Sequence, residues 1–384
     1  LSPEDKAGRD LVVGWMKDLG LAVRVDRLGN IVGTRAGTQG GPPVMIGSHI
    51  DTVRTGGLYD GNLGVLAGLE VIATVNDAGI VTQSPLAVAA FTNEEGSRFQ
   101  PDMMGSLAFV GGLDLETALA TRGIDGATVG DCLDAIGYAG DAPLGAAVNA
   151  AKAYVELHIE QGPVLDAEGV AIGAVEQVQG ISWTEFTFEG VSNHAGTTPM
   201  RMRHDAGFVA AAVAVEARRI AREIGGDQVA TVGYWEIGPN LVNVVPNQVK
   251  ITVDLRNTDE AKLQKAEAML HGFVAATAES EGVTVSHRSL ARFEPVPFSP
   301  VVIDRVAANA AALGLSTKRM PSGAGHDAQM LARICPAGMI FVPSQGGISH
   351  NVTEHTDPAD IAAGANVLLH TVLDLASGEV EFKE

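Results

Sequence analysis

Four short apolar stretches of the sequence lead directly into residues that bind metals. Imidazole nitrogen and carboxylate oxygen, without thiolate, suit a catalytic divalent ion better than a closed structural site. Each histidine taken alone is better explained as a structural residue, but their coincidence at the ends of several apolar stretches favours metal ligands. The stretches are VMIGSH with His49, LAVAAFTNEE with Glu94 and Glu95, AYVELHIEQ with His158, Glu160 and Gln161, and MIFVPSQGGISH with His350.

Three histidines and two carboxylates are too many for one tetrahedral ion that keeps an open position. Such a set fits two ions that share a bridging carboxylate, as in two-metal hydrolases. We expect Asp60 to be the bridge, because Gly56, Gly57 and Gly61 let the backbone around it fold close to the ions.

Asp51 follows His49 by two residues, so the two side chains would share one side of an extended segment. We expect the Asp51 carboxylate to accept the second imidazole N–H of His49. Such a contact fixes the tautomer and the orientation of a ligand.

Glu94 and Glu95 are adjacent at a strand end, so they point in opposite directions and should do different jobs. One can bind metal while the other faces the substrate as general base. Proton transfer from bulk water to a glutamate is uphill by about 15 kcal/mol, but by only about 4 kcal/mol when an ion lowers the pKa of the water to about 7. The base therefore needs the metal.

The elements that must position these residues indicate two domains. In the first half, helical segments alternate with buried strands such as PPVMIGSH, which is typical of an α/β sheet covered on both faces. Ligands bind such sheets outside the carboxyl ends of the strands. Near Gly180 the pattern changes to strands with one wet face, as in SWTEFTFEGVS, around two helices. We predict a catalytic domain over 1–179 and 293–384, with an α+β domain inserted over 180–292.

The composition excludes several classes of protein. The 384 residues carry a formal charge of -20, which argues against nucleic acid as a partner and against a polybasic membrane anchor. We find no uninterrupted apolar run of roughly 18 residues and expect no membrane-spanning helix. Cys132 and Cys335 are too few for a disulfide framework. A cytoplasmic location is the expectation.

Several motifs together resemble the hydantoinase/carbamoylase branch of the dinuclear-metal amidohydrolases and peptidases. The resemblance covers nearly the whole chain and implies an α/β phosphorylase/hydrolase-like catalytic domain with an inserted lid and dimerisation domain. It implies two divalent ions (Zn, Mn, Co or Ni), with Asp60 bridging them and Glu94 as the base. The motifs are GSHIDTVRTGGLYDGNLGVLAG, FTNEEGSRF, HIEQGPVL, GVSNHAGTTPM and ISHNVTEHTD, and the implied ligands are His49, Asp60, Glu95, His158 and His350.

Substrate contacts are expected in both domains. In NQVKITVDLRN the side chains of Ile251, Val253 and Leu255 face one way, and Arg256 faces the other, where it suits either a substrate carboxylate or an ion pair with Asp254. The resemblance implies that Arg256 and Asn243 hold the substrate carboxylate and that His194 polarises the scissile carbonyl in the neighbouring subunit of a homodimer. It also implies contacts from Gln161, Gly325 and His326. The remaining histidines, interpreted as structural, are His204, His271, His287, His355 and His370.

The preferred hypothesis is hydrolysis of an N-carbamoyl-L-amino acid, a small ureido carboxylate, to amino acid, CO2 and ammonia. Allantoate and N-carbamoyl-β-alanine remain alternatives, because both carry the same ureido and carboxylate groups. More distant alternatives are a metallo-aminopeptidase or acylase and a metal-binding protein without activity. A serine hydrolase is disfavoured, because Ser322 and Ser344 lack the glycine two residues before a nucleophile elbow.

Overall fold

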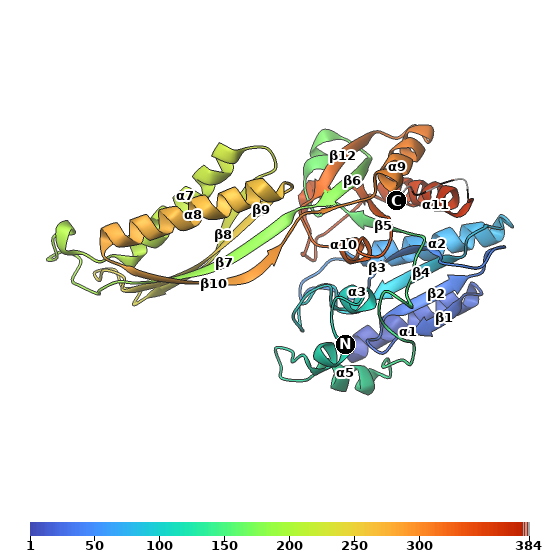
Figure 1. The fold of residues 1–384 in the computed structure, drawn as a ribbon, viewed down its shortest axis with the longest axis horizontal. Helices are drawn as coiled ribbons and strands as arrows, with labels where there is room; N and C mark the ends of the chain where they lie inside the picture. The colour runs from blue at the N-terminus through green and yellow to red at the C-terminus, as the bar shows by residue number, and fades with distance from the viewer. Residues whose placement is uncertain (379, 381, 383–384) are drawn as a thin grey trace. The chain divides into compact units, whose positions relative to one another are not determined.

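The computed structural model describes residues 1–378, 380 and 382, which form two compact units (Figure 1). The first unit comprises Leu1–Gln177 together with the chain from Pro297 onward, and the second comprises Val178–Val296. The second unit is therefore an insertion between two segments that fold together.

The first unit is built on a nine-stranded sheet of order β1-β2-β4-β3-β5-β13-β6-β11, with β12 paired to β6. The central strands β4, β3, β5 and β13 are parallel, and every residue in them is buried. This complete burial confirms the prediction of a sheet that is covered on both faces. The strands are β1 (Ala22–Val25), β2 (Ile31–Arg35), β3 (Val44–His49), β4 (Leu86–Phe91), β5 (Ala153–Ile159), β6 (Ile172–Val178), β11 (Val296–Pro297), β12 (Thr317–Ser322) and β13 (Ala337–Val342).

Helices cover both faces of this sheet. Glu156 of β5 accepts the backbone N–H of Ala328 in α10, whereas the next residue, Leu157, packs beside Gly364 of α11. Because successive strand residues point to opposite faces, α10 and α11 lie on opposite sides of β5. The helices are α1 (Pro3–Asp18), α2 (Asn62–Asp77), α3 (Met104–Phe109), α4 (Leu115–Ala120), α5 (Val129–Ile136), α6 (Val164–Glu168), α9 (Pro300–Ala312), α10 (Asp327–Leu331), α11 (Pro358–Ala376) and the 3-10 turn η2 (Gln345–Gly347).

Helix α11 is long and apolar enough, by length and composition alone, to cross a membrane; it is the one such helix within residues 1–378. It packs against β13, β5 and β3 of the sheet and against α2 and α9. Val367, Leu368, Val372 and Leu375 are buried by this packing. The position of α11 on the sheet therefore accounts for its apolar residues.

The second unit is a four-stranded antiparallel sheet of order β10-β7-β9-β8 with two long helices on one face (Figure 1). The expected alternation in β9 is confirmed: Ile251, Val253 and Leu255 are buried under the helices, and the residues between them are half-buried. The edges of the sheet are β10 and β8. The elements are β7 (Gly180–Glu189), η1 (Met200–Met202), α7 (Ala206–Ile224), β8 (Val229–Gly238), β9 (Gln248–Asn257), α8 (Glu260–Glu281) and β10 (Thr284–Phe293).

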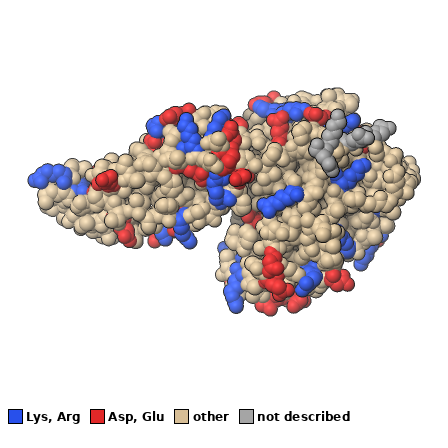
Figure 2. Space-filling view, in the orientation of Figure 1, with Lys and Arg blue, Asp and Glu red and all other residues tan. Residues whose placement is uncertain are grey.

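Charged side chains of both signs are interspersed on the face of the molecule drawn in Figure 2. The first unit carries ion pairs between exposed side chains, including Lys318 with Glu168 and Arg319 with Asp304. Exposed pairs of this kind contribute little to stability.

The core of the second unit should depend strongly on Phe186, which is fully buried and stacks on Phe188 with ring centroids 6.2 Å apart. We expect Phe186→Ala to lower the free energy of unfolding of this unit by about 3–5 kcal/mol, because it leaves a cavity. Chemical denaturation in a Trp15→Phe background, followed by the fluorescence of Trp183 and Trp235, measures this unit. The exposed Leu290 of β10 is the control: Leu290→Ala should cost less than about 1 kcal/mol. Equal losses would contradict the assignment of the core.

Candidate metal centre

The parallel strands bring the predicted ligands to one edge of the sheet in the first unit. His49 is the last residue of β3, His158 is the penultimate residue of β5, and Glu94 and Glu95 follow β4. His350 lies in the loop after β13. All the strands that carry these residues run in the same direction, so their carboxyl ends meet.

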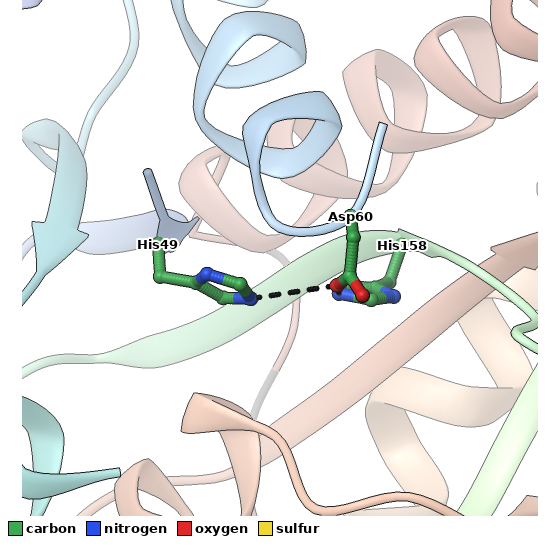
Figure 3. Close-up of side chains that lie close together, drawn as sticks. All are labelled: His49, Asp60 and His158. Carbon is green, nitrogen blue, oxygen red and sulfur yellow. Dashed lines mark ion pairs between the residues drawn. The ribbon is translucent and has the colours of Figure 1, made fainter. Parts of the chain in front are cut away.

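Asp60 occupies the centre of this group. Its Oδ1 lies 3.6 Å from Nε2 of His49 and 3.2 Å from Nε2 of His158. Its Oδ2 lies 3.2 Å from Nε2 of His350. Figure 3 shows the Asp60 carboxylate beside the His158 ring, with the His49 ring pointing toward it. The carboxylate therefore contacts imidazoles through both of its oxygens.

The described residues form three groups of potential ligands, and two of these groups have Asp60 in common. In each group the ligand atoms lie within 4.8 Å of one another. Two ligands about 2.1 Å from one tetrahedral ion are about 3.4 Å apart, which is close to the separations around Asp60. Glu95 Oε1 is buried and lacks a hydrogen-bond partner among the described residues. These residues therefore fit divalent ions. The two groups that share Asp60 are His49, Asp60 and His158, and Asp60, Glu95 and His350; the third group is Glu156, His158 and His326.

The buried charges shift one another's pKa values strongly. Burial acts to raise the pKa of Asp60, but the hydrogen bonds from His158, His350 and His49 outweigh it and hold the pKa well below its usual value. Burial acts to lower the pKa of His49, but Glu94, Asp60 and Asp51 raise it well above its usual value. A cation that binds these imidazoles must displace protons from them.

The glycine at position 61 makes the close approach of the loop possible. Gly61 has φ +68°, and a Cβ atom there would lie 2.3 Å from Cε1 of the His49 ring. Its backbone N–H also donates to Nε2 of His158, at 3.3 Å. A side chain at this position would therefore push the loop away from the histidines.

Asp51 acts differently from the sequence prediction. Nδ1 of His49 contacts the backbone carbonyl oxygen of Asp51 at 2.9 Å, whereas the Asp51 carboxylate is 3.9 Å away. The carboxylate instead accepts the backbone N–H groups of Glu94 and Glu95, at 3.1 and 3.2 Å. Strand β3 ends at His49, so the side-chain alternation of a strand does not extend to Asp51. Asp51 thus holds both the imidazole and the turn that carries the glutamates.

The two glutamates approach different ligand groups. Glu94 Oε2 lies 3.4 Å from Nε2 of His49, and Glu95 Oε2 lies 3.6 Å from Nε2 of His350. The preceding residue, Asn93, has φ +55°, so the chain leaves β4 in a tight turn. Burial, together with the nearby carboxylates of Asp327 and Glu95, raises the pKa of Glu94 well above its usual value. A carboxyl group in this environment can both accept and release a proton.

Gln161 is an expected substrate contact in the first unit, and it directly contacts Asp60. Its Nε2 donates to Asp60 Oδ2 at 2.8 Å, and its φ of +57° is rare for a residue other than glycine. Its neighbour Glu160 instead accepts the backbone N–H groups of Val164 and Leu165 at the start of α6.

The ring of His326 contacts the ring of His158, and the two ring centroids are 4.5 Å apart. It is buried, as is Ser322, whose Oγ is 2.8 Å from His326 Nε2. The adjacent Gly325 packs against Met103, because a Cβ there would lie 3.0 Å from the Met103 methyl carbon. The Ser322 hydroxyl also bonds the backbone of Ala324, so it is enclosed rather than presented as a nucleophile.

The other expected substrate contacts lie in the second unit. His194 is exposed, and its Nδ1 accepts the N–H groups of Gly196 and Thr197. The segment of His194 pairs with the segment of Asn243, whose carbonyl accepts the N–H of Ala195.

Arg256 forms the ion pair with Asp254 that the sequence left as an alternative. The closest approach of the guanidinium to the carboxylate is 2.9 Å, and the guanidinium lies 5.7 Å from the centroid of the Trp183 ring. A substrate carboxylate would have to share Arg256 with Asp254.

Glu156 was not among the residues predicted from the sequence; it is fully buried on the same side of β5 as His158. It accepts hydrogen bonds from Ser48 Oγ at 2.7 Å, Tyr154 Oη at 3.2 Å and the backbone N–H of Ala328 at 2.9 Å. The spacing of two residues from a candidate ligand was the available signal. Glu354, in the loop after His350, was also missed and contacts the Asp60 loop.

Comparison with known proteins places this geometry in a family. Residues 45–374 match the model of peptidase family M20/M25/M40. The chain is 43% identical to an N-carbamoyl-L-amino-acid amidohydrolase of Rhizobium meliloti, over 98% of this chain and 90% of that protein. It is 36% identical to a ureidoglycolate hydrolase of Arabidopsis thaliana, over 97% and 80%.

A solved structure of similar fold is an amidase of the hydantoinase/carbamoylase family from Burkholderia multivorans. It superposes with a TM-score of 0.95 at 45% identity, covering 99% of this chain and 92% of that one. The match extends over both units and therefore includes the inserted segment as well as the candidate metal ligands. The chain belongs to peptidase family M20/M25/M40, on its hydantoinase/carbamoylase amidase branch.

Proposed function

We propose that this protein is a metal-dependent amidohydrolase that cleaves the ureido C–N bond of N-carbamoyl-L-amino acids, giving the amino acid, CO2 and ammonia. The observation that carries the proposal is the Asp60 carboxylate shared by two ligand groups, with the buried Glu94 beside one of them. The substrate class is supported by the relatives, several of which are N-carbamoyl-L-amino-acid amidohydrolases.

The proposed cofactor is a pair of divalent ions, with Zn, Mn, Co or Ni all compatible with nitrogen and oxygen ligands. His49 and His158 would hold one ion, Glu95 and His350 the other, and Asp60 would bridge them. When bound, such ions activate water and stabilise the negative charge that develops on the carbonyl oxygen.

The reaction requires one proton to move from the attacking water to the leaving nitrogen. Glu94 accepts this proton as water adds to the ureido carbon, and donates it when the C–N bond breaks. The carbamic acid that results loses CO2. Gln161, which donates to Asp60 Oδ2 in this structure, would orient the substrate.

The inserted domain is proposed as the lid and as the dimerisation domain. Arg256 and Asn243 would hold the substrate carboxylate, and His194 would polarise the scissile carbonyl in the partner's site. His194 and Asn243 lie on paired segments, which supports a shared role. A ureido compound that lacks the carboxylate should then be hydrolysed at least about 10-fold more slowly, because one charged hydrogen bond is lost. Equal rates of hydrolysis for compounds with and without the carboxylate would show that Arg256 does not bind the substrate carboxylate.

The open edge of β8 should form the interface of the dimer. Tyr234, Trp235 and Ile237 are large, partly exposed side chains on this strand, and an unpaired strand edge is a template for pairing with another chain. We expect the wild-type protein to sediment as a dimer and Trp235→Glu as a monomer with little activity. The matched control, Leu290→Glu on the opposite edge strand β10, should remain dimeric. A monomeric wild type, or a dimeric Trp235→Glu, would contradict the proposal.

One assay tests the activity. The protein is incubated with N-carbamoyl-L-amino acids and their D enantiomers, with and without Mn, Co, Ni or Zn, and ammonia is measured. Ureidoglycolate is included because plant relatives are ureidoglycolate hydrolases, and allantoate, N-carbamoyl-β-alanine and dipeptides complete the panel. Metal-dependent ammonia release, fastest with N-carbamoyl-L-amino acids, is the expected result. If no ureido compound yields ammonia, the proposed function is wrong.

A further inference from the structure

Glu354 joins two loops that carry proposed metal ligands. Its Oε1 accepts the backbone N–H groups of Tyr59 and Asp60, at 3.1 and 3.2 Å. Its Oε2 accepts the hydroxyl of Ser349 at 2.9 Å. Asp60 and His350 are far apart in the sequence. The buried carboxylate of Glu354 binds the backbone of Asp60 and the side chain of Ser349, which directly precedes His350.

The surrounding loops are shaped to receive this carboxylate. A Cβ at Gly57 would lie 2.4 Å from both Cβ and Oε1 of Glu354, so glycine at this position leaves room for the side chain. The Tyr59 hydroxyl lies 3.3 Å from Nδ1 of His355. The two loops therefore also contact each other through the residues next to Asp60 and Glu354.

The backbone conformation of His350 also indicates that neighbouring residues hold this segment in place. His350 has φ +53°, in the left-handed region that residues other than glycine rarely occupy. Such a conformation persists where the surrounding contacts enforce it. Ser349 Oγ contacts both Glu354 Oε2 and, at 3.5 Å, Asp60 Oδ2, so it ties the strained segment to both acidic residues.

We propose that Glu354 is a positioning residue that holds Asp60 and His350 in a ligating arrangement before metal binds. Both of its oxygens already accept hydrogen bonds from the protein, and this satisfied state suits a support better than an additional ligand. The inference rests on the proposed metal centre but concerns only the residues that organise it.

The test is the affinity of the protein for Zn and Mn, measured by titration against a competing chelator. Removing a group that orients metal ligands typically weakens metal binding about 10- to 100-fold, so we expect this loss for Glu354→Ala. Glu354→Asp keeps the charge but shortens the reach, and should also bind at least about 10-fold more weakly. Glu354→Gln keeps an acceptor for the two N–H groups and should remain within about 5-fold of wild type.

Val213→Ala, in the core of the second unit, is the control for general loss of stability, and its metal affinity should equal that of wild type. If Glu354→Ala does not fold, the metal affinities of Glu354→Asp and Glu354→Gln test the inference. Wild-type affinity in Glu354→Asp, or weaker binding in Glu354→Gln than in Glu354→Asp, overturns the inference. A wild-type protein that binds metal but releases no ammonia would refute the proposed function and leave this inference standing.

Discussion

Replacement of Glu94 by glutamine is expected to lower kcat by about 10²- to 10⁴-fold, the usual contribution of a general base, while the metal content stays near that of wild type. The amide has the shape of the carboxyl group but cannot take the proton from water. Glu94 Oε2 lies 3.4 Å from Nε2 of His49, but Glu94 belongs to none of the three-residue groups of potential metal ligands. Ammonia release and elemental analysis of the same preparation measure the two quantities.

Glu95→Gln is the matched control for this experiment. Glu95 lies in the group with Asp60 and His350, so the same chemical change one residue later should lower metal content as well as activity. If Glu94→Gln empties the centre while Glu95→Gln leaves it filled, the roles assigned to the two glutamates are reversed.

Asp60→Asn is expected to lose both ions together, and with them all measurable activity. The carboxylate faces imidazoles with both oxygens, at 3.2 to 3.6 Å. An amide offers one oxygen and turns an NH2 group toward the other ligand group, where it cannot coordinate a cation. Elemental analysis after dialysis should fall from two ions per chain to less than one.

The same substitution at Asp254, whose carboxylate pairs with Arg256 in the second unit, is the control and should leave both ions bound. Retention of two ions by Asp60→Asn would show that Asp60 is not a bridge. Retention of one ion at full affinity would show that Asp60 serves only one of the two groups.

The local patterns of the sequence were sufficient to predict the sheet and its ligand-bearing edge. Buried parallel strands need apolar residues on both faces, so β3 and β5 are visible as continuous apolar stretches. A polar residue at the end of such a strand, such as His49, stands out for the same reason. In β9 the alternation of Ile251 and Val253 with polar residues correctly identified the buried face.

The contacts around the ligands were decided by tertiary structure. The sequence assigned the Asp51 carboxylate to His49, but β3 ends at His49, and the carboxylate accepts the N–H groups of Glu94 and Glu95 instead. Glu354 reaches Asp60 across 294 positions of sequence. Periodicity determines which face of an element is buried, because it follows from the geometry of the element itself. It does not determine the torsion angles of loops, and these angles select which distant groups meet.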